Sequence, residues 1–306
     1  MFYEHPSFRG ESPDPAKLEA AIVVLTPSES KRLIAKAIAI LPEVKAAVAK
    51  GLLVIGWGTT TVYVAEEILG RPIPNKIDFA SGVISEGELN ANHPATKTIF
   101  PFVLQNGRPS ELHQRAALRS FKPGDVFIKG ANALDVNGDI GILIAAETGG
   151  SAYDAWYATS IRSGLFICPV GLEKLVPSVR DVANKCGIYR FKYSIGVPVS
   201  LITFSTAKVV TEIQAIQVLT GAHACQVASG GIAGSEGAVT LVLEAEAPVL
   251  DRAFELVKSV KGEPPMPPPR QYGAPRAASM GYDPNRLREA VQQSDTAQKL
   301  TSQPRG

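Results

Sequence analysis

Apolar and polar positions alternate in two patterns along the first two thirds of the chain. In short stretches such as residues 52–55 and 140–146 every position is apolar or glycine, which is typical of strands buried on both faces of a sheet. Residues 61–69 and 152–162 instead place apolar side chains at helical spacing. Buried strands that alternate with helices predict an α/β fold, in which helices flank a layered, largely parallel sheet.

Thr26, Pro27 and Glu29 predict where the first helix begins. Thr26 can cap the helix, Pro27 suits its first turn, and Glu29 stands where a capping box needs an acceptor. The helix is expected to continue through the apolar positions that follow.

The pattern divides the chain into four parts. Residues 1–19 are expected to form an irregular N-terminal arm, and residues 20–205 the α/β ligand-binding domain. Residues 206–262 hold two strands around a Gly-rich turn and two amphipathic helices, which predicts an appended small α+β module. Residues 263–306 are rich in proline, so we expect a disordered, mobile tail, whose short terminal helix either frays or docks on a partner.

Composition narrows the class of protein. A net charge of +2 gives no reason to expect nucleic acid or an acidic membrane surface as a partner. No apolar run approaches the length of a membrane span, and the N-terminus lacks the order of a signal peptide. The three cysteines, Cys168, Cys186 and Cys225, have no CxxC spacing, which favours reduced thiols over a metal cluster. We therefore expect a cytoplasmic protein without a metal site.

The most informative stretch is a Gly-Thr turn between a buried strand and a helix. After residues 52–55 the chain reads Gly56-Trp57-Gly58-Thr59-Thr60-Thr61 and then turns helical. A strand–turn–helix of this kind points main-chain N–H groups and the positive end of a helix at one place. Gly56, Gly58 and the three threonines are therefore predicted to bind an anion. Trp57 either stacks on a ligand ring or wedges between helices.

Two further polar loops, 130–139 and 147–151, also follow buried strands. The carboxyl ends of parallel strands meet at one edge of a sheet, so we expect all three loops to line one ligand site. The candidate contacts outside the Gly-Thr turn are Lys129, Gly130, Asn132, Thr148 and Gly149. Lys129 would neutralise a phosphate or carboxylate, or else be solvated.

Two carboxylates in these loops are candidates for catalysis. Glu147 ends a buried strand, where partial desolvation would make it a general base or an acyl-accepting nucleophile. The alternative is a structural carboxylate that caps a helix or pairs with a lysine. Asp135 forms a cluster with Asn137 and Asp139 that superficially suggests a calcium loop, but the twelfth position of that loop is Ala146, which argues against calcium. Either Asn132 or Asp135 is expected to face the ligand.

Two features outside these loops carry open alternatives. His93 lies in a loop between two predicted strands. One interpretation is that it acts as an acid or as a lid contact, and the other is that it has no functional role. The GGIAGSEG stretch in the small module is a flexible hairpin turn or a second phosphate loop.

The order of these segments resembles the superfamily of ribose-5-phosphate isomerase, glucosamine-6-phosphate deaminase and class I coenzyme A transferases. It is most similar to lactate-utilisation (LUD) type domains. The resemblance covers about residues 20–205 and rests on residues 56–61, DVFIKGANALD (125–135), AAETGG (145–150) and GLEKLVPSVRD (171–181). It implies phosphosugar, coenzyme A or folate-type ligands above the sheet edge. The superfamily also includes non-enzymatic sensors.

The sequence departs from that superfamily at functional positions. Thr60 stands where the isomerases have glycine, and their acidic GADE-like loop is replaced by Gly130-Ala131-Asn132-Ala133. The deaminase's active-site histidine has no counterpart. Asp135 is the nearest remaining acid to the altered loop. The small module is reminiscent of a dimerisation insert.

The sequence thus predicts a protein that binds a phosphorylated or coenzyme-A-like small metabolite at the Gly-Thr turn. Glu147 would catalyse isomerisation or acyl or coenzyme A transfer, with Asp135 as the second candidate. The alternative is a non-catalytic ligand sensor or assembly protein on the same fold. No cofactor is required by the pattern, although coenzyme A would fit. A homodimer is favoured as the assembly.

Overall fold

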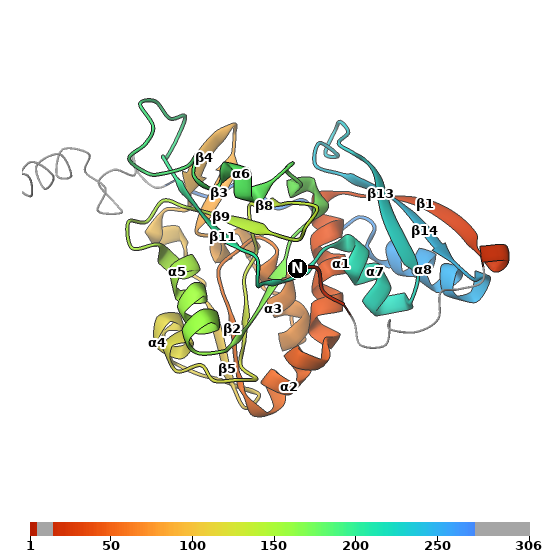
Figure 1. The fold of residues 1–306 in the computed structure, drawn as a ribbon, viewed down its shortest axis with the longest axis horizontal. Coiled ribbons are helices and arrows are strands. Elements are labelled where there is room, and N and C mark those ends of the chain that lie inside the picture. The colour runs from red at the N-terminus through yellow and green to blue at the C-terminus, as the bar shows by residue number, and fades with distance from the viewer. Residues whose placement is uncertain (5–14, 273–306) are drawn as a thin grey trace, which may run out of the picture.

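The computed structural model describes residues 1–4 and 15–272, and its central layer is a six-stranded sheet (Figure 1). Four strands run parallel and two antiparallel strands extend one edge. In spatial order they are β12 (Lys208–Val210), β10 (Leu165–Pro169), β7 (Val126–Ile128), β2 (Leu52–Ile55), β5 (Phe102–Gln105) and β6 (Arg108–Pro109). The predicted α/β class with a largely parallel sheet is confirmed.

Helices pack on both faces of this sheet (Figure 1). One face carries α1 (Pro27–Ile40), α2 (Pro42–Lys50) and α3 (Thr61–Leu69), and the other carries α4 (Gln114–Arg119) and α5 (Gly150–Trp156). A single π-helical turn, Tyr157–Ile161, continues α5. The helix α1 begins as predicted, because Thr26 and Glu29 form a reciprocal capping box and Pro27 occupies the first turn.

A second, antiparallel sheet has the order β11-β9-β8 and lies beside the first. Its strands are β11 (Ser200–Phe204), β9 (Ile140–Ile144) and β8 (Ala133–Leu134). The apolar run at 140–146 was expected to be a strand of the parallel sheet. It belongs instead to this second sheet. Because α5 and α6 (Val179–Ala183) contact β9, it is buried like a central strand, and burial alone sets the apolar pattern.

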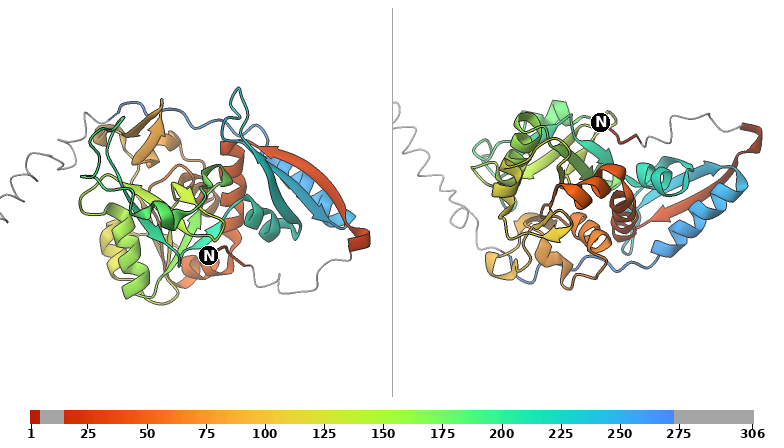
Figure 2. Two further views of the ribbon diagram at one scale, coloured as in Figure 1. Left: turned by 45° about the horizontal axis from the view of Figure 1, so that its top comes forward. Right: turned by 90° about the horizontal axis from the view of Figure 1, so that it is seen from below.

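The small module is a three-stranded sheet with two helices, and Figure 2 shows it projecting from the main body. Its C-terminal elements are α7 (Glu212–Thr220), β13 (His223–Ser229), β14 (Val239–Ala245) and α8 (Ala247–Val260). The third strand is β1 (Glu19–Leu25), which pairs antiparallel with β14 from Glu19–Ala245 to Leu25–Val239. The module therefore takes a strand from the start of the chain and is not built from residues 206–262 alone. Because β1 lies more than 200 residues before β14 in the sequence, the residues near either strand do not indicate that the two strands pair.

Shorter elements complete the described fold. A hairpin of β3 (Gly82–Ser85) and β4 (Glu88–Ala91) follows the 3-10 turn Lys76–Phe79. The side chain of Asn92 donates hydrogen bonds to the carbonyls of Ile77 and Ala80 and stabilises that turn. The remaining 3-10 turns are Pro15–Lys17, Pro94–Thr96 and Leu172–Lys174. Among the described helices, none is long and apolar enough to cross a bilayer.

The segment 263–272 does not behave as the start of a mobile tail. Glu263 pairs with Arg32 at 2.8 Å, and Arg270 pairs with Asp78. Tyr272 shares a hydrogen bond of 2.7 Å with Ser85, and Figure 2 shows the segment running across the molecule to the β3–β4 hairpin. The predicted terminal helix and the rest of the tail lie outside the described residues, as does most of the N-terminal arm.

Candidate functional site

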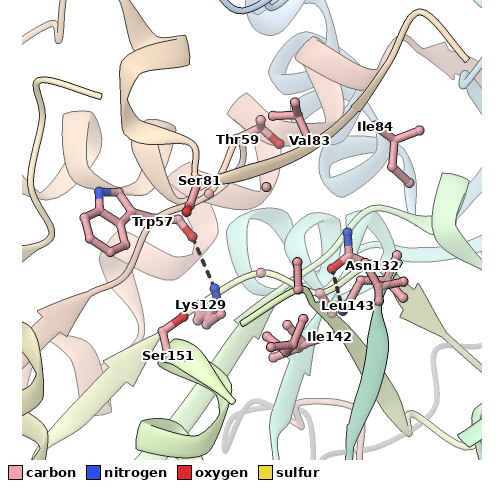
Figure 3. A pocket seen from close by; sticks show the side chains of 18 of the residues that line it. Trp57, Thr59, Ser81, Val83, Ile84, Lys129, Asn132, Ile142, Leu143 and Ser151 are labelled. Atoms are coloured by element: carbon pink, nitrogen blue, oxygen red, sulfur yellow. Dashed lines mark hydrogen bonds between the residues drawn. The ribbon is translucent and has the colours of Figure 1, made fainter. Parts of the chain in front are cut away.

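A cavity of about 300 Å³ lies between the two sheets and the β3–β4 hairpin (Figure 3). Its floor is formed by the residues that follow β2 and β7 at the carboxyl ends of these parallel strands. One wall comes from β9 and the residues after it, and the other from the hairpin. A cavity at this edge of a parallel sheet is the usual place for a ligand on an α/β fold.

The Gly-Thr turn forms one end of the cavity. The Thr61 hydroxyl donates to the carbonyl oxygens of Gly56 at 2.7 Å and Gly58 at 3.1 Å, which holds the turn from behind. A Cβ at Gly58 would lie 2.9 Å from that hydroxyl oxygen, so glycine leaves room for the contact. Gly58, Thr59 and Thr60 line the cavity, whereas Gly56 and Thr61 only shape it.

Three main-chain amides at this turn have no partner in the part of the chain that the structure describes. Within the described residues, the N–H groups of Thr59, Thr60 and Thr61 donate no hydrogen bond, while the N–H of Gly58 donates to the Phe79 carbonyl at 2.9 Å. The helix α3 begins at Thr61. Free amides at the positive end of a helix favour a bound anion.

Lys129 is the most buried of the charged residues that line the cavity. Its side chain is 9 % exposed, and its Nζ donates one long hydrogen bond of 3.4 Å to the Trp57 carbonyl (Figure 3). No carboxylate among the described residues forms an ion pair with it. Burial without such a partner disfavours the charged form and lowers the pKa of the Lys129 ammonium to about 8.

Two further lysines line the cavity, and no Asp or Glu is among its described lining residues. The Nζ of Lys174 donates to the Ala131 carbonyl at 2.9 Å. The Nζ of Lys97 lies 4.3 Å from the centre of the Trp57 ring, a cation–π contact. The Trp57 indole N–H in turn donates to the Ile99 carbonyl at 2.9 Å, so this side chain is held by the protein itself. The electrostatic character of the cavity is therefore positive.

Glu147 lies outside the cavity. Its side chain is exposed, and one carboxylate oxygen accepts a hydrogen bond of 2.6 Å from the Tyr189 hydroxyl. Thr148 and Gly149 do not line the cavity either, although the next residues, Gly150 and Ser151, do. This loop was expected at the edge of the parallel sheet, but β9 belongs to the second sheet, and of the residues after it Ala145, Ala146, Gly150 and Ser151 reach the cavity while Glu147, Thr148 and Gly149 do not. Glu147 therefore lacks the desolvation that a general base at this cavity would need.

Asp135 has a structural role. It is fully buried, and its carboxylate accepts hydrogen bonds from the N–H groups of Asn137 at 2.9 Å, Asp139 at 3.2 Å and Val179 at 2.9 Å. Asn132 instead lines the cavity and accepts a hydrogen bond from the Leu143 N–H at 3.0 Å. Of the two candidates in this loop, the structure therefore brings Asn132 to the cavity.

Of the other candidates, Lys129 and Gly130 line the cavity and His93 does not. His93 instead donates its main-chain N–H to the Gln271 carbonyl at 2.9 Å. No group of three or more His, Cys, Asp or Glu side chains among the described residues is arranged for a metal ion.

Sequence reasoning missed the hairpin wall and several polar contacts. Ser81, Asn90, Lys97 and Ser151 line the cavity, together with apolar residues that include Val83, Ile84, Leu89 and Ile142. The hairpin residues belong to no motif, because the hairpin reaches the cavity only through the tertiary fold. Ser151 and Ile142 lie within the loop 147–151 and the apolar run 140–146, but neither was a candidate contact. Lys174 lies within the motif 171–181, so that motif was the one sequence feature that could have identified Lys174 as a candidate.

No protein-family model, curated protein or solved structure matches this chain.

Proposed function

We propose that the cavity binds a small anionic metabolite, phosphorylated or coenzyme-A-like, with its anion at the Gly-Thr turn. One observation carries the proposal: the amides of Thr59 and Thr60, which have no partner among the described residues, stand at the end of a cavity whose described lining includes three lysines and no carboxylate. Such a site lowers the free energy of a bound anion and raises that of a cation.

The size and walls of the cavity limit the ligand. About 300 Å³ is at the lower end of the volume of small-molecule sites, which suits a phosphosugar better than a whole coenzyme A. The apolar side chains of Val83, Leu89 and Ile142 face the carbon skeleton, while Ser81 and Ser151 offer hydroxyls. A coenzyme A ester would place only its acyl end inside.

A non-catalytic sensor or assembly protein is the second candidate. The observation in its favour is that Glu147 and Asp135, the two proposed catalytic carboxylates, lie outside the cavity. The resemblance to the isomerase, deaminase and coenzyme A transferase superfamily remains a proposal, and it allows either outcome.

Calorimetry in phosphate-free buffer tests the proposal with ribose 5-phosphate and ribose as a matched pair. We expect the phosphate ester to bind and ribose to bind far more weakly. Lys174→Gln should weaken the phosphate ester roughly tenfold, because a charged contact is lost. Lys122→Gln, at an exposed lysine remote from the cavity, is the control and should change nothing.

Equal affinity for ribose and ribose 5-phosphate would contradict the proposal. Binding that is insensitive to added salt would contradict it too, since ionic contacts are screened. Coenzyme A in the same assay distinguishes a phosphosugar site from a coenzyme A site.

A further inference from the structure

Lys129 is placed as a reactive amine and not only as a counter-charge. A lysine ammonium has three hydrogen-bond donors, and when buried it normally pairs with a carboxylate. Here the only described polar contact of Nζ is the long one to the Trp57 carbonyl. The cavity contains no Asp or Glu among its described residues that could hold the proton on the amine.

The amine is therefore often neutral. With the pKa near 8, about a quarter of the molecules at pH 7.5 carry an uncharged Lys129, against about a thousandth at the ordinary value of 10.5. A neutral amine has a lone pair, and in a cavity that lone pair can attack a carbonyl carbon.

The fold also brings the amine close to the proposed anion site. The strands β2 and β7 pair in parallel, with Ile55 opposite Ile128, and the Gly56 N–H donates to the Ile128 carbonyl at 2.9 Å. The Gly-Thr turn and Lys129 thus follow directly from neighbouring strands at the same sheet edge. An anionic group at the turn would leave the carbon chain of its ligand beside Nζ.

We propose that Lys129 forms a Schiff base with the carbonyl group of an anionic aldehyde or ketone bound in this cavity. The choice of an anionic substrate rests on the proposed function, whereas the reactivity of the amine does not. The Lys129 lone pair attacks the carbonyl carbon, and one of the two amine protons is transferred to the carbonyl oxygen, which gives a carbinolamine. The hydroxyl group then leaves as water together with the second amine proton, and the carbon–nitrogen double bond forms. The step needs no oxidant or reductant.

Reductive trapping tests this inference on the full-length protein. Glyceraldehyde 3-phosphate and sodium cyanoborohydride, which reduces an imine to a stable amine, are added in phosphate-free buffer at pH 7.5. Intact mass and peptide mapping then locate the adduct. We expect one adduct per chain at Lys129, formed at least roughly tenfold faster than at the exposed Lys122, because the neutral fraction is larger.

Lys129→Arg and Lys129→Met should both remove this adduct, and Lys122→Arg should keep it. Circular dichroism shows whether each variant is folded. If one of the two Lys129 variants does not fold, the other still tests whether the adduct depends on Lys129. The rate of trapping should rise with pH, reach half of its plateau near pH 8 and level off about one pH unit higher. Adducts spread over surface lysines, with no preference for Lys129, would overturn the inference.

Glyceraldehyde in a parallel reaction separates the two proposals. Equal trapping of Lys129 by glyceraldehyde and its phosphate would support the reactive amine and overturn the anion site. Binding of ribose 5-phosphate by calorimetry without trapping at Lys129 would leave the anion site standing and overturn the Schiff base.

Discussion

At the scale of single residues, Lys129 is expected to reduce the stability of the folded protein. Its pKa falls from 10.5 to about 8 on folding, so the unfolded chain binds more protons between these values. Stability therefore rises as pH increases from about 8 to 10.5, and the cost is fully present at pH 7. Lys129→Met should raise the free energy of unfolding at pH 7 by up to roughly 3 kcal/mol and flatten that rise.

Urea unfolding at pH 7 and pH 10 in phosphate-free buffer measures both effects. Lys122→Met, at an exposed site, should leave the stability within about 0.5 kcal/mol of wild type. A Lys129→Met protein that is less stable at pH 7, or that keeps the wild-type pH dependence, would contradict the prediction.

Glu212 gives a pH effect of the opposite sign at the first residue of α7. One carboxylate oxygen accepts the Leu172 N–H at 3.0 Å, and the other has no described partner. Burial, and then the charge of Glu173, raises the pKa of Glu212 from 4.5 to about 7. The folded state then binds more protons than the unfolded state, so stability falls as pH rises from about 4.5 to 7.

Glu212→Gln should remove this loss, which amounts to up to roughly 3 kcal/mol. The glutamine side chain keeps an acceptor for the Leu172 N–H. Urea unfolding at pH 5 and pH 8 should show a smaller decrease for the variant than for wild type. Glu255→Gln, at an exposed position of α8, is the control. Identical decreases in wild type and Glu212→Gln would refute the assignment.

The positions of residues whose geometry is set by their sequence neighbours could be predicted from the sequence. The positions of residues that depend on contacts with distant segments could not. The Gly-Thr turn lies at the cavity because its geometry is set by a few adjacent residues. Glu147 was misplaced, since its position depends on which sheet β9 joins. Asp135 was given a ligand role although its carboxylate accepts three main-chain hydrogen bonds. Two of these donors lie in the same loop, but Val179 lies 44 residues away, and the sequence of one loop does not reveal that partner.

At the scale of elements, the junction of β2 and α3 depends on the Thr61 hydroxyl. Thr61→Val removes the hydrogen bonds to the Gly56 and Gly58 carbonyls. The Gly58 carbonyl still accepts the Val62 N–H at 3.2 Å, so the buried Gly56 carbonyl is the acceptor most affected. We expect a loss of about 1–2 kcal/mol in the free energy of unfolding. The affinity for ribose 5-phosphate should fall several-fold, because the free amides of the turn lose their support.

Thr61→Ser is the matched control, since it keeps the hydroxyl and removes only a methyl group. It should retain most of the affinity in calorimetry. If Thr61→Val binds ribose 5-phosphate as well as Thr61→Ser does, the turn does not position the anion.

Helices and central strands were predicted better than the partners of edge strands. The capping box fixes the start of α1 locally, so three residues were enough to locate it. The pairing of β1 with β14 joins segments more than 200 residues apart, and no local pattern encodes it. The hairpin β3–β4 likewise reaches the cavity through contacts with segments that are distant in sequence, which no local pattern encodes. Long-range pairing therefore accounts for most of what the sequence left open.

At the scale of the whole molecule, the segment 263–272 ties distant parts together. At one end Glu263 pairs with Arg32, which also pairs with Glu66 and Glu67 on α3. At the other end Arg270 pairs with Asp78, just before the β3–β4 hairpin that walls the cavity. The segment thus restrains this wall from outside the ligand site.

Arg270→Ala should loosen the hairpin without disturbing the sheet. Hydrogen exchange followed by mass spectrometry should be faster in residues 82–91 and unchanged in β2 and β7, and ribose 5-phosphate should bind several-fold more weakly. Asp78 is 2 % exposed, so its charge would also lose its main partner. The double variant Asp78→Asn with Arg270→Ala removes that charge as well. If the loss of restraint by the segment causes the faster exchange, hydrogen exchange in residues 82–91 stays fast in the double variant, even where the free energy of unfolding recovers. Exchange that returns to the wild-type rate would instead attribute the effect to the buried charge alone.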